Sequence, residues 1–384
     1  MAGKNNLEGI LNISSPFLPV SSQLMYGGTE RVIANMDREI EKAGFSSYVA
    51  APGDSDLYGV LVPTHESSLW TDDEGNVTKT EVRQEDIDEH YLRALDFIYA
   101  NPDKVQVIHD HPGPGDSIVK RYPGEIKELG IPVLVTMHHA SPTNNEYEKM
   151  IDFKALGRIQ EDLGSLVEFN AISQSQRNHF SPYINIPKEN VVYHGLPIED
   201  YDMGDGKDGF LFSIGRIAYS KGQHIAIDAA KKLGMELVIA GGVQANDREY
   251  FETMVKPHID NEQIHFVGSL NDEQKKPYFK NAAAYLMPIQ WEEPFGLVVI
   301  EAMASGTPVV AYNRGSMPEI ITNDYDGFVV NETGDYQTDL NNYVESVRKS
   351  LDLPRINPRK TVEQRFTAEK ETSDYLDIYK RMLE

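Results

Sequence analysis

Short apolar runs alternate with helical patterns through most of this chain of 384 residues. In the first half the runs lie at Leu7–Ile13, Tyr48–Ala51, Val105–His109, Val133–Met137, Ala171–Ser173 and Val191–Tyr193. In the second half they lie at Phe210–Ile214, Leu237–Ala240, Ile264–Val267, Ala284–Met287, Pro308–Ala311 and Phe328–Val330. Short apolar runs are typical of buried strands, and strands that alternate with helices form parallel sheets. The pattern therefore predicts an α/β fold.

Apolar residues at helical spacing occupy several intervals between these runs. Val32, Ile33, Met36 and Ile40 predict a helix over Thr29–Ala43, because residues three and four apart share one helix face. Further helices are predicted over Gly222–Leu233, Leu340–Leu351 and Glu371–Leu383. The polar segment Trp70–Val82 is predicted to form a hairpin.

The chain is long enough for two domains, each with its own core. A stretch rich in Gly and Asp, Leu196–Gly209, lies between the two α/β series and is predicted to be a linker. We therefore predict a first domain over residues 1–196 and a second over residues 197–358, followed by a final helical segment over residues 359–384. Ligands of open parallel sheets bind beyond the carboxyl ends of the strands, so we expect the functional residues there, facing a central cleft.

Composition and charge exclude several classes of function. The 36 basic and 60 acidic residues give a net charge of −24, which repels nucleic acids and anionic membranes at long range. The absence of cysteine excludes disulfides and thiolate metal sites. No run approaches the roughly 20 apolar residues of a membrane span. The first residues, MAGKNNLEGILNIS, lack the apolar core of a secretory signal, so we expect a cytoplasmic protein.

Two cations follow the first predicted strand of the second half. Gly215-Arg216 ends this strand, and Lys221-Gly222 precedes the next helix. Two cations beside the positive end of a helix are suited to bind a diphosphate, even on an acidic protein. The alternative interpretation is a solvated loop with two ordinary surface cations.

Paired glycines, Gly27-Gly28, stand between the first predicted strand and the first helix. Glycine pairs let the backbone approach a ligand closely, as in nucleotide-binding loops. The alternative is a plain turn, which is the favoured interpretation of a lone glycine pair.

Four histidines stand at predicted strand ends: His109, His111, His138 and His139. In an extended segment His109 and His111 point the same way. Imidazole is a common metal ligand, but no thiolate or paired carboxylates stand nearby at familiar spacing, so a metal is disfavoured. Hydrogen bonding to sugar hydroxyls, or to a developing charge, is the favoured interpretation. For His109 and His139 a satisfied buried histidine is the alternative.

Two carboxylates, Glu293 and Glu301, stand eight residues apart around a Pro-Phe-Gly turn that opens an apolar helix. A largely helical path places them on the order of 10 Å apart along the axis. Paired glycosidase carboxylates lie about 5–9.5 Å apart across one bond, so two separate contacts along one extended ligand fit better. The alternative for Glu301 is an acid in the first helical turn that is favoured by the helix dipole.

Together these motifs resemble the donor-site signature of retaining glycosyltransferases of family 4, which have the GT-B fold. The matching positions are Glu293, Phe295, Gly296, Leu297, Glu301, Ala302, Met303, Ala304, Gly306 and Pro308, then Gly315, Pro318 and Glu319. The pattern G-R-x-x-x-x-K-G matches at Gly215, Arg216, Lys221 and Gly222, and G-G-x-E-R matches at Gly27, Gly28, Glu30 and Arg31. The segment WEEPFG is similar to a bacterial subgroup that includes glucosyltransferases of pterins and antibiotics.

The resemblance implies two Rossmann-like domains, with the final helical segment crossing back to the first one. It implies that Arg216 and Lys221 neutralise the diphosphate of a sugar nucleotide, aided by backbone amides of Phe295, Gly296 and Leu297. It further implies that Glu301 holds the ribose and Glu293 a hydroxyl of the transferred sugar. Gly28 would let the first domain close over the phosphates, His111 would point at the reacting sugar, and His138 would lie near it.

The resemblance also implies the reaction. We expect transfer of a hexose with retention of configuration, no metal or other cofactor, and a leaving phosphate that takes the acceptor proton. A UDP-sugar is the expected donor, and the acceptor is expected to be a small or soluble molecule. The acceptor site is expected around Gly27, Trp70, His111 and Ser141–Tyr147. The chain departs from the family at Tyr193–Leu196, where many members have Asn-Gly-Val/Ile-Asp, and at His-Asp-His-Pro, so the acceptor stays open.

Two other functions fit the same fold. A glycoside phosphorylase would use free phosphate in place of the diphosphate, and a non-catalytic protein would bind the sugar nucleotide without reaction. The complete set of Arg216, Lys221, Glu293 and Glu301 argues against the non-catalytic protein. Membrane attachment is disfavoured because the predicted helix near Asp86–Tyr99 is acidic, whereas membrane-binding helices are basic.

Overall fold

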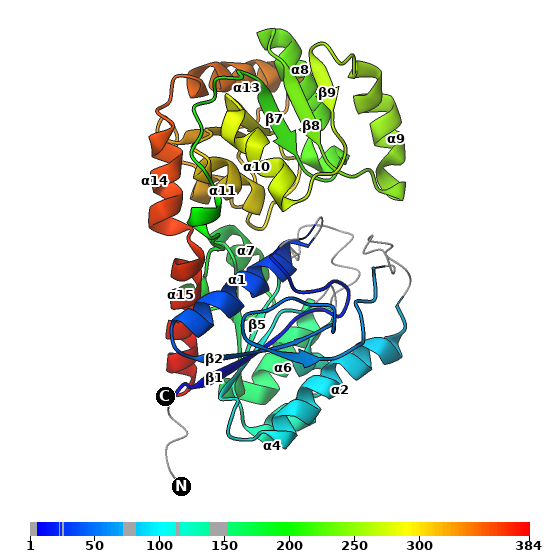
Figure 1. Cartoon of the computed structure of the whole chain (residues 1–384), viewed down its shortest axis with the longest axis vertical. Coiled ribbons are helices and arrows are strands. Elements are labelled where there is room, and N and C mark those ends of the chain that lie inside the picture. The colour runs from blue at the N-terminus through cyan, green and yellow to red at the C-terminus, as the bar shows by residue number, and fades with distance from the viewer. Residues whose placement is uncertain (1–5, 23, 25–26, 72–81, 113–115, 139–151) are drawn as a thin grey trace. The chain divides into compact units, whose positions relative to one another are not determined.

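A computed structural model of the chain describes residues 6–22, 24, 27–71, 82–112, 116–138 and 152–384. The chain forms two compact units, one of Met1–His194 with Ala368–Glu384 and the other of Gly195–Thr367. Among the described residues, each unit contains one six-stranded parallel sheet and its own apolar core (Figure 1). The predicted α/β fold with two doubly wound sheets is confirmed.

The sheet of the first unit has the strand order β3-β2-β1-β4-β5-β6. Its strands are β1 (Gly9–Ile13), β2 (Ser46–Ala51), β3 (Val60–Pro63), β4 (Val107–Asp110), β5 (Val133–Thr136) and β6 (Val167–Asn170). Its helices are α1 (Gly28–Lys42), α2 (Gln84–Ala100), α3 (Ile118–Arg121), α4 (Pro123–Leu129), α6 (Phe153–Leu163), α7 (Gln174–Phe180) and α15 (Ala368–Met382). The order reverses between β1 and β4, which makes their carboxyl ends the switch point where ligands bind in such sheets.

Strand alternation divides the first sheet into two faces. The apolar residues of one face pack with α2, α3, α4, α6 and α7 in one large cluster. Val49 and Ala51 of β2 point to the other face and pack against Ile33 and Ala34 of α1. The last helix, α15, packs against α1. Because both faces are covered, the strands read as nearly continuous apolar runs.

The sheet of the second unit has the strand order β12-β11-β10-β7-β8-β9, with its switch point between β7 and β10. Its strands are β7 (Leu211–Ile214), β8 (Leu237–Ala240), β9 (Ile264–Phe266), β10 (Ala284–Met287), β11 (Val309–Tyr312) and β12 (Gly327–Val330). Its helices are α8 (Gln223–Leu233), α9 (Arg248–Tyr250), α10 (Asp272–Asn281), α11 (Leu297–Ala304), α12 (Met317–Ile320), α13 (Tyr336–Ser350) and α14 (Ile356–Arg365). One face packs with α8 and α13 in a single apolar cluster.

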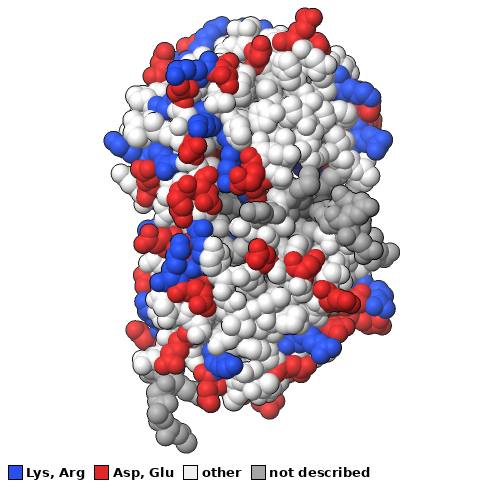
Figure 2. Space-filling model, viewed as in Figure 1, with Lys and Arg blue, Asp and Glu red and all other residues white. Residues whose placement is uncertain are grey.

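Figure 2 shows charged side chains of both signs mixed along the left side and the rim of the face in view, whereas its upper right part is largely uncharged. Figure 2 shows no continuous basic stripe on this face. Such a surface fits the acidic composition and gives no footprint for a polyanion on this side.

Two predicted strands of the first unit are wrong. Ala171–Ser173 was expected to be a strand, but the strand is β6, Val167–Asn170, in which Glu168 interrupts the apolar pattern. Ser173 instead caps α7, since its side chain accepts a hydrogen bond from the amide of Gln176. Val191–Tyr193 forms no strand among the described elements and makes only an isolated bridge, from Val191 to Ala171.

One strand of the first sheet was not predicted, and one predicted hairpin falls mostly outside the described residues. The edge strand β3, Val60–Pro63, was not predicted, because one face of it is exposed and its apolar run is short. The predicted hairpin Trp70–Val82 lies, apart from its ends, outside the described residues.

Arg355 holds together several loops of the second unit. Its guanidinium donates to the carbonyls of Gly204, Ala282, Lys280 and Ser305, and to the hydroxyl of Thr307, at 2.6–3.2 Å. Burial lowers the pKa of Arg355 to about 10, with nearby Asp205 opposing the shift. The three nitrogens of one planar group thus satisfy acceptors that the predicted linker and two other segments, 280–282 and 305–307, bring to one place.

We predict that Arg355→Met lowers the free energy of unfolding by about 3 kcal/mol, because several partly buried carbonyls lose their donor. Chemical denaturation of the full chain measures this difference. The matched control is Arg348→Met, since the side chain of Arg348 is 58% exposed and its ion pair with Glu345 is long, at 3.7 Å. The control should change stability by less than about 1 kcal/mol. Equal losses in the two variants would contradict the role given to Arg355.

Candidate active site

The loop after β7 and the loop after β10 meet at the switch point of the second sheet. The amide of Gln290 donates to the carbonyl of Ser220 at 2.7 Å and ties the two loops together. Gly222, the residue before α8, has φ +73°, and a Cβ there would lie 2.0 Å from the carbonyl oxygen of Pro288. Only glycine permits both the backbone conformation and the close approach. The approach brings Lys221 to the carboxyl end of β10.

Lys221 and Glu293 form an ion pair across this switch point. The Nζ of Lys221 lies 2.6 Å from Oε2 of Glu293, and the indole Nε1 of Trp291 donates to the same oxygen at 2.8 Å. The lysine also lies 5.1 Å from the centre of the Trp291 ring. The side chains of Lys221 and Glu293 are 23% and 13% exposed, so both are partly accessible. A cation and an oriented carboxylate therefore stand side by side at the ligand-binding edge.

Arg216 lies in the same loop as Lys221 but contacts different partners. Its guanidinium is 3.5 Å from Oδ2 of Asp247 and 3.5 Å from Oε1 of Gln244. These are long contacts, and the side chain is 43% exposed. Arg216 is therefore weakly held and accessible to an anion, whereas Lys221 is already oriented by Glu293.

The loop before α11 is fixed by the segment before α12. The amide of Gly315 donates to Oε2 of Glu292 at 2.6 Å, and the amide of Ser316 donates to the carbonyl of Glu293 at 2.9 Å. The hydroxyl of Ser316 donates to the carbonyl of Phe295 at 2.5 Å. These bonds explain why the downstream Gly-x-x-Pro-Glu motif accompanies the first one in the sequence.

The N-terminus of α11 faces this loop without a capping side chain. Gly296 is the N-cap with φ 95°, and its lack of a side chain leaves capping to other groups. Leu297 begins the helix. This uncapped helix start follows the loop whose Glu293 pairs with Lys221, and such a position is suited to bind an anion. The binding of a diphosphate there stays a prediction.

Glu301 is buried and already paired. Its Oε1 lies 2.7 Å from Nζ of Lys275 and accepts a hydrogen bond from the Tyr201 hydroxyl at 3.2 Å. Lys275 also lies 2.6 Å from Oδ1 of Asp272. Glu301 is the fifth residue of α11, and the first turn of that helix contains no acid. The alternative interpretation, an acid placed for the helix dipole in the first turn, is therefore wrong.

The switch point of the first sheet collects a second group of polar residues. His111, just after β4, places Nε2 3.3 Å from Oδ1 of Asn12 on β1 and Nδ1 2.9 Å from Nε2 of His138. The rings of His109 and His111 point the same way, with their centres 3.8 Å apart, as strand alternation predicts. His111 is fully buried, and both of its ring nitrogens have protein partners. Its predicted contact with a sugar stays a prediction.

Both ring nitrogens of His109 have hydrogen-bond partners in the protein. Its Nδ1 lies 2.6 Å from the hydroxyl of Tyr379 on α15, and its Nε2 lies 2.6 Å from the hydroxyl of Thr136 on β5. Burial lowers the pKa of His109 well below its ordinary value, and His138 adds to this effect. His109 thus fits the alternative of a satisfied buried histidine. His139 lies outside the described residues.

The glycine pair starts α1. Gly27 has φ 126°, and a Cβ there would lie 2.7 Å from Oε2 of Glu30. Glu30 is buried and accepts a hydrogen bond from the Ser15 hydroxyl at 3.2 Å. Burial raises the pKa of Glu30 to about 7, although hydrogen bonds partly oppose the shift. The positive φ favours glycine at position 27, whereas Gly28 is the first residue of the helix itself.

The predicted acceptor region is described only in part. Trp70 stacks on Phe17 with ring centres 4.4 Å apart. The segment Ser141–Tyr147 lies outside the described residues.

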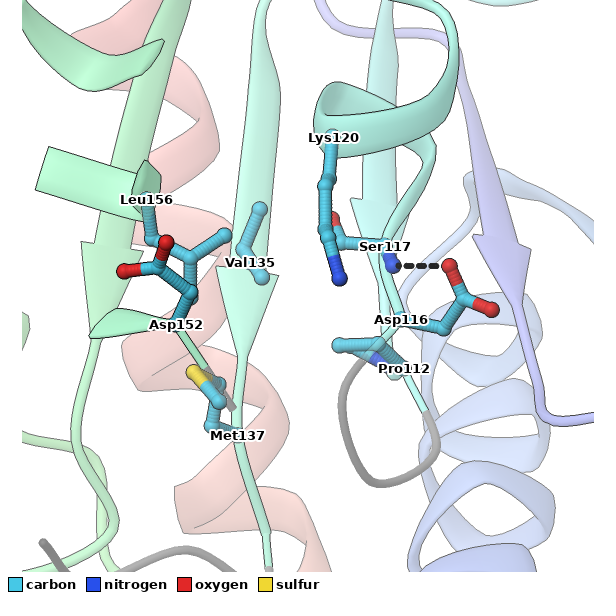
Figure 3. Close-up of a pocket in the computed structure, with 8 residues that line it drawn as sticks. All are labelled: Pro112, Asp116, Ser117, Lys120, Val135, Met137, Asp152 and Leu156. Atoms are coloured by element: carbon cyan, nitrogen blue, oxygen red, sulfur yellow. Dashed lines mark hydrogen bonds between the residues drawn. The ribbon is translucent and has the colours of Figure 1, made fainter. Parts of the chain in front are cut away.

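The first unit also contains a pocket, which is lined by residues of or just after β4 and β5 and by residues of α3 and α6. Figure 3 shows its lining, which is Pro112, Asp116, Ser117, Lys120, Val135, Met137, Asp152 and Leu156. The empty space between these residues measures about 270 Å³, a volume that includes open solvent. None of its lining residues was singled out from the sequence, so the pocket and the polar switch points are separate features.

Asp110 lies on the pocket side of β4 and is fully buried. Its Oδ2 accepts hydrogen bonds from the Ser117 hydroxyl at 2.7 Å and from the amide of Ile118 at 2.8 Å. Burial raises the pKa of Asp110 to about 7, and these two hydrogen bonds partly oppose the shift.

Two features are absent from the described part of the chain. No three or more His, Asp or Glu side chains there converge in a way that could hold a metal ion. No helix of that part combines the length and the apolar character needed to cross a membrane.

Several residues of these sites were missed from the sequence. Trp291 stands inside the conspicuous WEEPFG segment, so its neighbourhood gave a usable signal. Lys275 lies in a polar helix, and Glu371 lies in the last helix, far from any motif. Lys275 and Glu371 give no local signal, because only folding brings them to their partners, which are Glu301 and His194.

Residues 204–360, less than half of the chain, match the family described as "Glycosyl transferases group 1". An uncharacterized glycosyltransferase of Methanocaldococcus jannaschii is 30% identical over 181 residues, which cover 41% of this chain and 45% of that protein. The chain thus spans less than half the length of this curated relative. The match includes the loops that carry Arg216, Lys221, Glu293 and Glu301 within the family region.

Solved structures share the fold over nearly the whole chain. AviGT4, a glycosyltransferase involved in avilamycin A biosynthesis, superposes with a TM-score of 0.66 at 22% identity, covering 98% of both chains. The Anabaena protein HepE, solved in complex with UDP and glucose, gives a TM-score of 0.66 at 16% identity and covers 96% of this chain and 98% of that one. At these identities the likeness shows the fold alone. That fold, with two Rossmann-like domains, is the GT-B fold of glycosyltransferases.

We predict that Lys275→Met lowers the free energy of unfolding by roughly 3–5 kcal/mol, because it leaves the buried carboxylates of Asp272 and Glu301 without their shared cation. Thermal and chemical denaturation measure this loss. The neighbouring Lys276→Met is the matched control, since Lys276 pairs with Glu273, whose side chain is 67% exposed. The control should lose at most about 1 kcal/mol. A loss from Lys275→Met no larger than that of the control would contradict a buried pair.

We predict that Asp110→Asn gains stability relative to the natural chain as the pH rises. The raised pKa means that the folded protein resists ionisation of Asp110, so stability present at low pH is lost as the pH rises toward about 7. Between about pH 5.5 and about pH 8 the relative advantage of the variant should grow by about 2 kcal/mol. Denaturant titrations at both pH values measure it, with the exposed Asp96→Asn as a control that should stay constant. A constant difference for Asp110→Asn would show that the carboxyl ionises as in the unfolded chain.

Proposed function

We propose that this protein is a retaining glycosyltransferase that transfers a hexose from a nucleoside diphosphate sugar to a hydroxyl of a small or soluble acceptor. The observation that carries the proposal is the group of Lys221, Glu293 and Trp291 at the switch point of the second sheet, beside the start of α11. The match of residues 204–360 to a glycosyltransferase family supports the same conclusion. The proposal includes the cytoplasm as the compartment.

The lysine can bind phosphate without releasing its carboxylate. An ammonium group has three N–H donors, and Glu293 takes one of them. The remaining donors, the accessible guanidinium of Arg216 and the N-terminus of α11 can then bind diphosphate oxygens. Because the leaving diphosphate gains charge in the transition state, these groups favour the transition state over the bound donor.

The carboxylate of Glu293 is arranged to hold a sugar hydroxyl. Lys221 and Trp291 both bind Oε2, and among the described residues no donor is bound to Oε1. A carboxylate held at one oxygen keeps the other for a hydroxyl donor. Oε2 of Glu293 lies 2.6 Å from Nζ of Lys221, so a sugar held by Glu293 and a diphosphate held by Lys221 would lie next to each other.

The proposed reaction has the following steps. The bond between the anomeric carbon and the diphosphate oxygen breaks, the acceptor oxygen bonds to the same face of that carbon, and the acceptor proton passes to the leaving phosphate. No metal is required in this proposal, because Lys221 and Arg216 supply the positive charge. Buried Glu301, held by Lys275, is proposed to orient the ribose.

A UDP-sugar is the donor that we propose to test first. The Anabaena protein HepE shares the fold and was solved with UDP and glucose, which makes UDP-glucose the natural starting compound. Donor hydrolysis with UDP-, ADP- and GDP-sugars would identify the base, and calorimetric titration with UDP would measure its binding.

We predict that Lys221→Ala and Arg216→Ala each reduce kcat by roughly 10²- to 10³-fold, because each removes a charge that stabilises the departing diphosphate. Initial rates of sugar transfer or donor hydrolysis measure the effect. Lys231→Ala is the matched control, because Lys231 lies on the exposed side of the neighbouring helix α8. The control should keep the full rate. Full activity in both Lys221→Ala and Arg216→Ala would overturn the proposed function.

A further inference from the structure

A continuous chain of hydrogen-bonded side chains runs through the first unit from β1 to α15. His111 Nδ1 lies 2.9 Å from His138 Nε2, and His138 Nδ1 lies 3.2 Å from His194 Nε2. His194 Nδ1 lies 2.7 Å from Oε1 of Glu371 on α15. At the other end, His111 Nε2 lies 3.3 Å from the side chain of Asn12. Three imidazoles in line thus connect a carboxylate to the switch point of the first sheet.

The chain is buried along its whole length. Its members come from five separate segments of the first unit, and none is more than 7% exposed. The rings of His138 and His194 are nearly parallel, with an angle of 12° between their planes. Burial lowers the pKa of His111 well below its ordinary value, and His109 and His194 add to the effect, so His111 carries only one ring proton near neutral pH.

The carboxylate at one end determines where each proton sits. With Glu371 ionised, its carboxylate only accepts hydrogen bonds, so Nδ1 of His194 donates to it. With His194 neutral, its Nε2 has no proton and accepts from Nδ1–H of His138. The same reasoning continues one ring further and places the proton of His111 on Nδ1. Its Nε2 is then an acceptor.

The end at Asn12 agrees with this proton order. The amide nitrogen Nδ2 of Asn12 is buried and has no hydrogen-bond partner among the described residues, while its Oδ1 faces Nε2 of His111. Rotation of the amide by 180° exchanges the two atoms and lets Nδ2 donate to Nε2. The rotated amide removes an unsatisfied buried donor.

Two other interpretations of these histidines fit less well. A metal centre requires converging ligands, and no such group of three occurs in the described part of the chain. A purely structural network is the situation of His109, whose ring nitrogens contact the hydroxyls of Tyr379 and Thr136. Hydroxyls both donate and accept, so they impose no tautomer on His109, whereas a carboxylate does impose one on His194.

We propose that Glu371 is a positioning residue that acts through His194 and His138 to hold the proton of His111 on Nδ1, leaving Nε2 as a hydrogen-bond acceptor. Resting on the proposed function, this gives His111 a defined specificity. A hydroxyl of the bound sugar or acceptor that reaches His111 takes the place of the Asn12 amide as the donor to Nε2, because this nitrogen has one lone pair, and the same nitrogen does not donate to a phosphate or carboxylate. Substrates with a hydroxyl at this position are favoured over analogues with an anionic group there.

The test is nuclear magnetic resonance of the full chain with ¹⁵N-labelled histidine. Long-range proton–nitrogen correlations distinguish protonated from unprotonated ring nitrogens, and a His111→Gln variant assigns the signals of His111. In the natural protein, Nδ1 of His111 should be protonated and Nε2 unprotonated. In Glu371→Leu, which removes the acceptor, the order should reverse, so that Nε2 of His111 becomes protonated and donates to Oδ1 of Asn12.

The matched control is Tyr375→Phe on the same face of α15. Tyr375 accepts a hydrogen bond from Asn170 and touches none of the ring nitrogens in the chain, so this variant should leave the tautomer of His111 unchanged. A protonated Nε2 in the natural protein would overturn the proposal, even if Glu371→Leu did not fold. An unchanged tautomer in folded Glu371→Leu would also overturn it.

The experiment is independent of the proposed function, because it uses the protein without donor or acceptor. If the protein has the predicted tautomers but transfers no sugar, only the proposed transferase function is overturned. If the transferase is active, Glu371→Leu should in addition reduce turnover by roughly 5- to 150-fold, the effect of one misdirected hydrogen bond.

Discussion

Parallel strands that are covered on both faces leave one place for polar chemistry, which is the edge where their carboxyl ends meet. Both units obey this constraint. In the second unit, Lys221 follows β7 and Glu293 follows β10, and the two strands are neighbours at the switch point. In the first unit, Asn12 on β1 and His111 after β4 occupy the corresponding position. The order of the strands therefore brings these polar residues together at the switch point of each sheet.

Charge at these edges is held in two different states. The pair of Lys221 and Glu293 is partly exposed, so an incoming anion can share the cation at a modest cost of desolvation. The pair of Lys275 and Glu301 is almost completely buried and fixes its carboxylate in place. Accessible charges suit the part of a ligand whose charge changes during reaction, and buried pairs suit a part that only needs orientation.

The last helix, α15, supplies hydrogen-bond partners for buried polar residues of the first unit. Glu371, Tyr375 and Tyr379 are four residues apart and therefore lie on one face of α15. Each contacts a different polar residue: Glu371 contacts His194, Tyr375 contacts Asn170 on β6, and Tyr379 contacts His109 on β4. Buried polar groups at strand ends need partners, and here the partners come from a segment some 200 residues away in sequence.

The sequence by itself determined the fold class, most strands of both sheets, and the positions of Arg216, Lys221, Glu293 and Glu301 at strand ends or the helix that follows. Periodicity and motif spacing are local properties, so they are readable without the fold. The local pattern was misleading at β6, where Glu168 interrupts the apolar run.

Only the tertiary structure decided which charges and hydrogen bonds pair. Lys221 and Glu293 are 72 residues apart, and His194 and Glu371 are 177 residues apart. Pairing at such separations depends on strand order and on the removal of water from both partners, and no local propensity records either one.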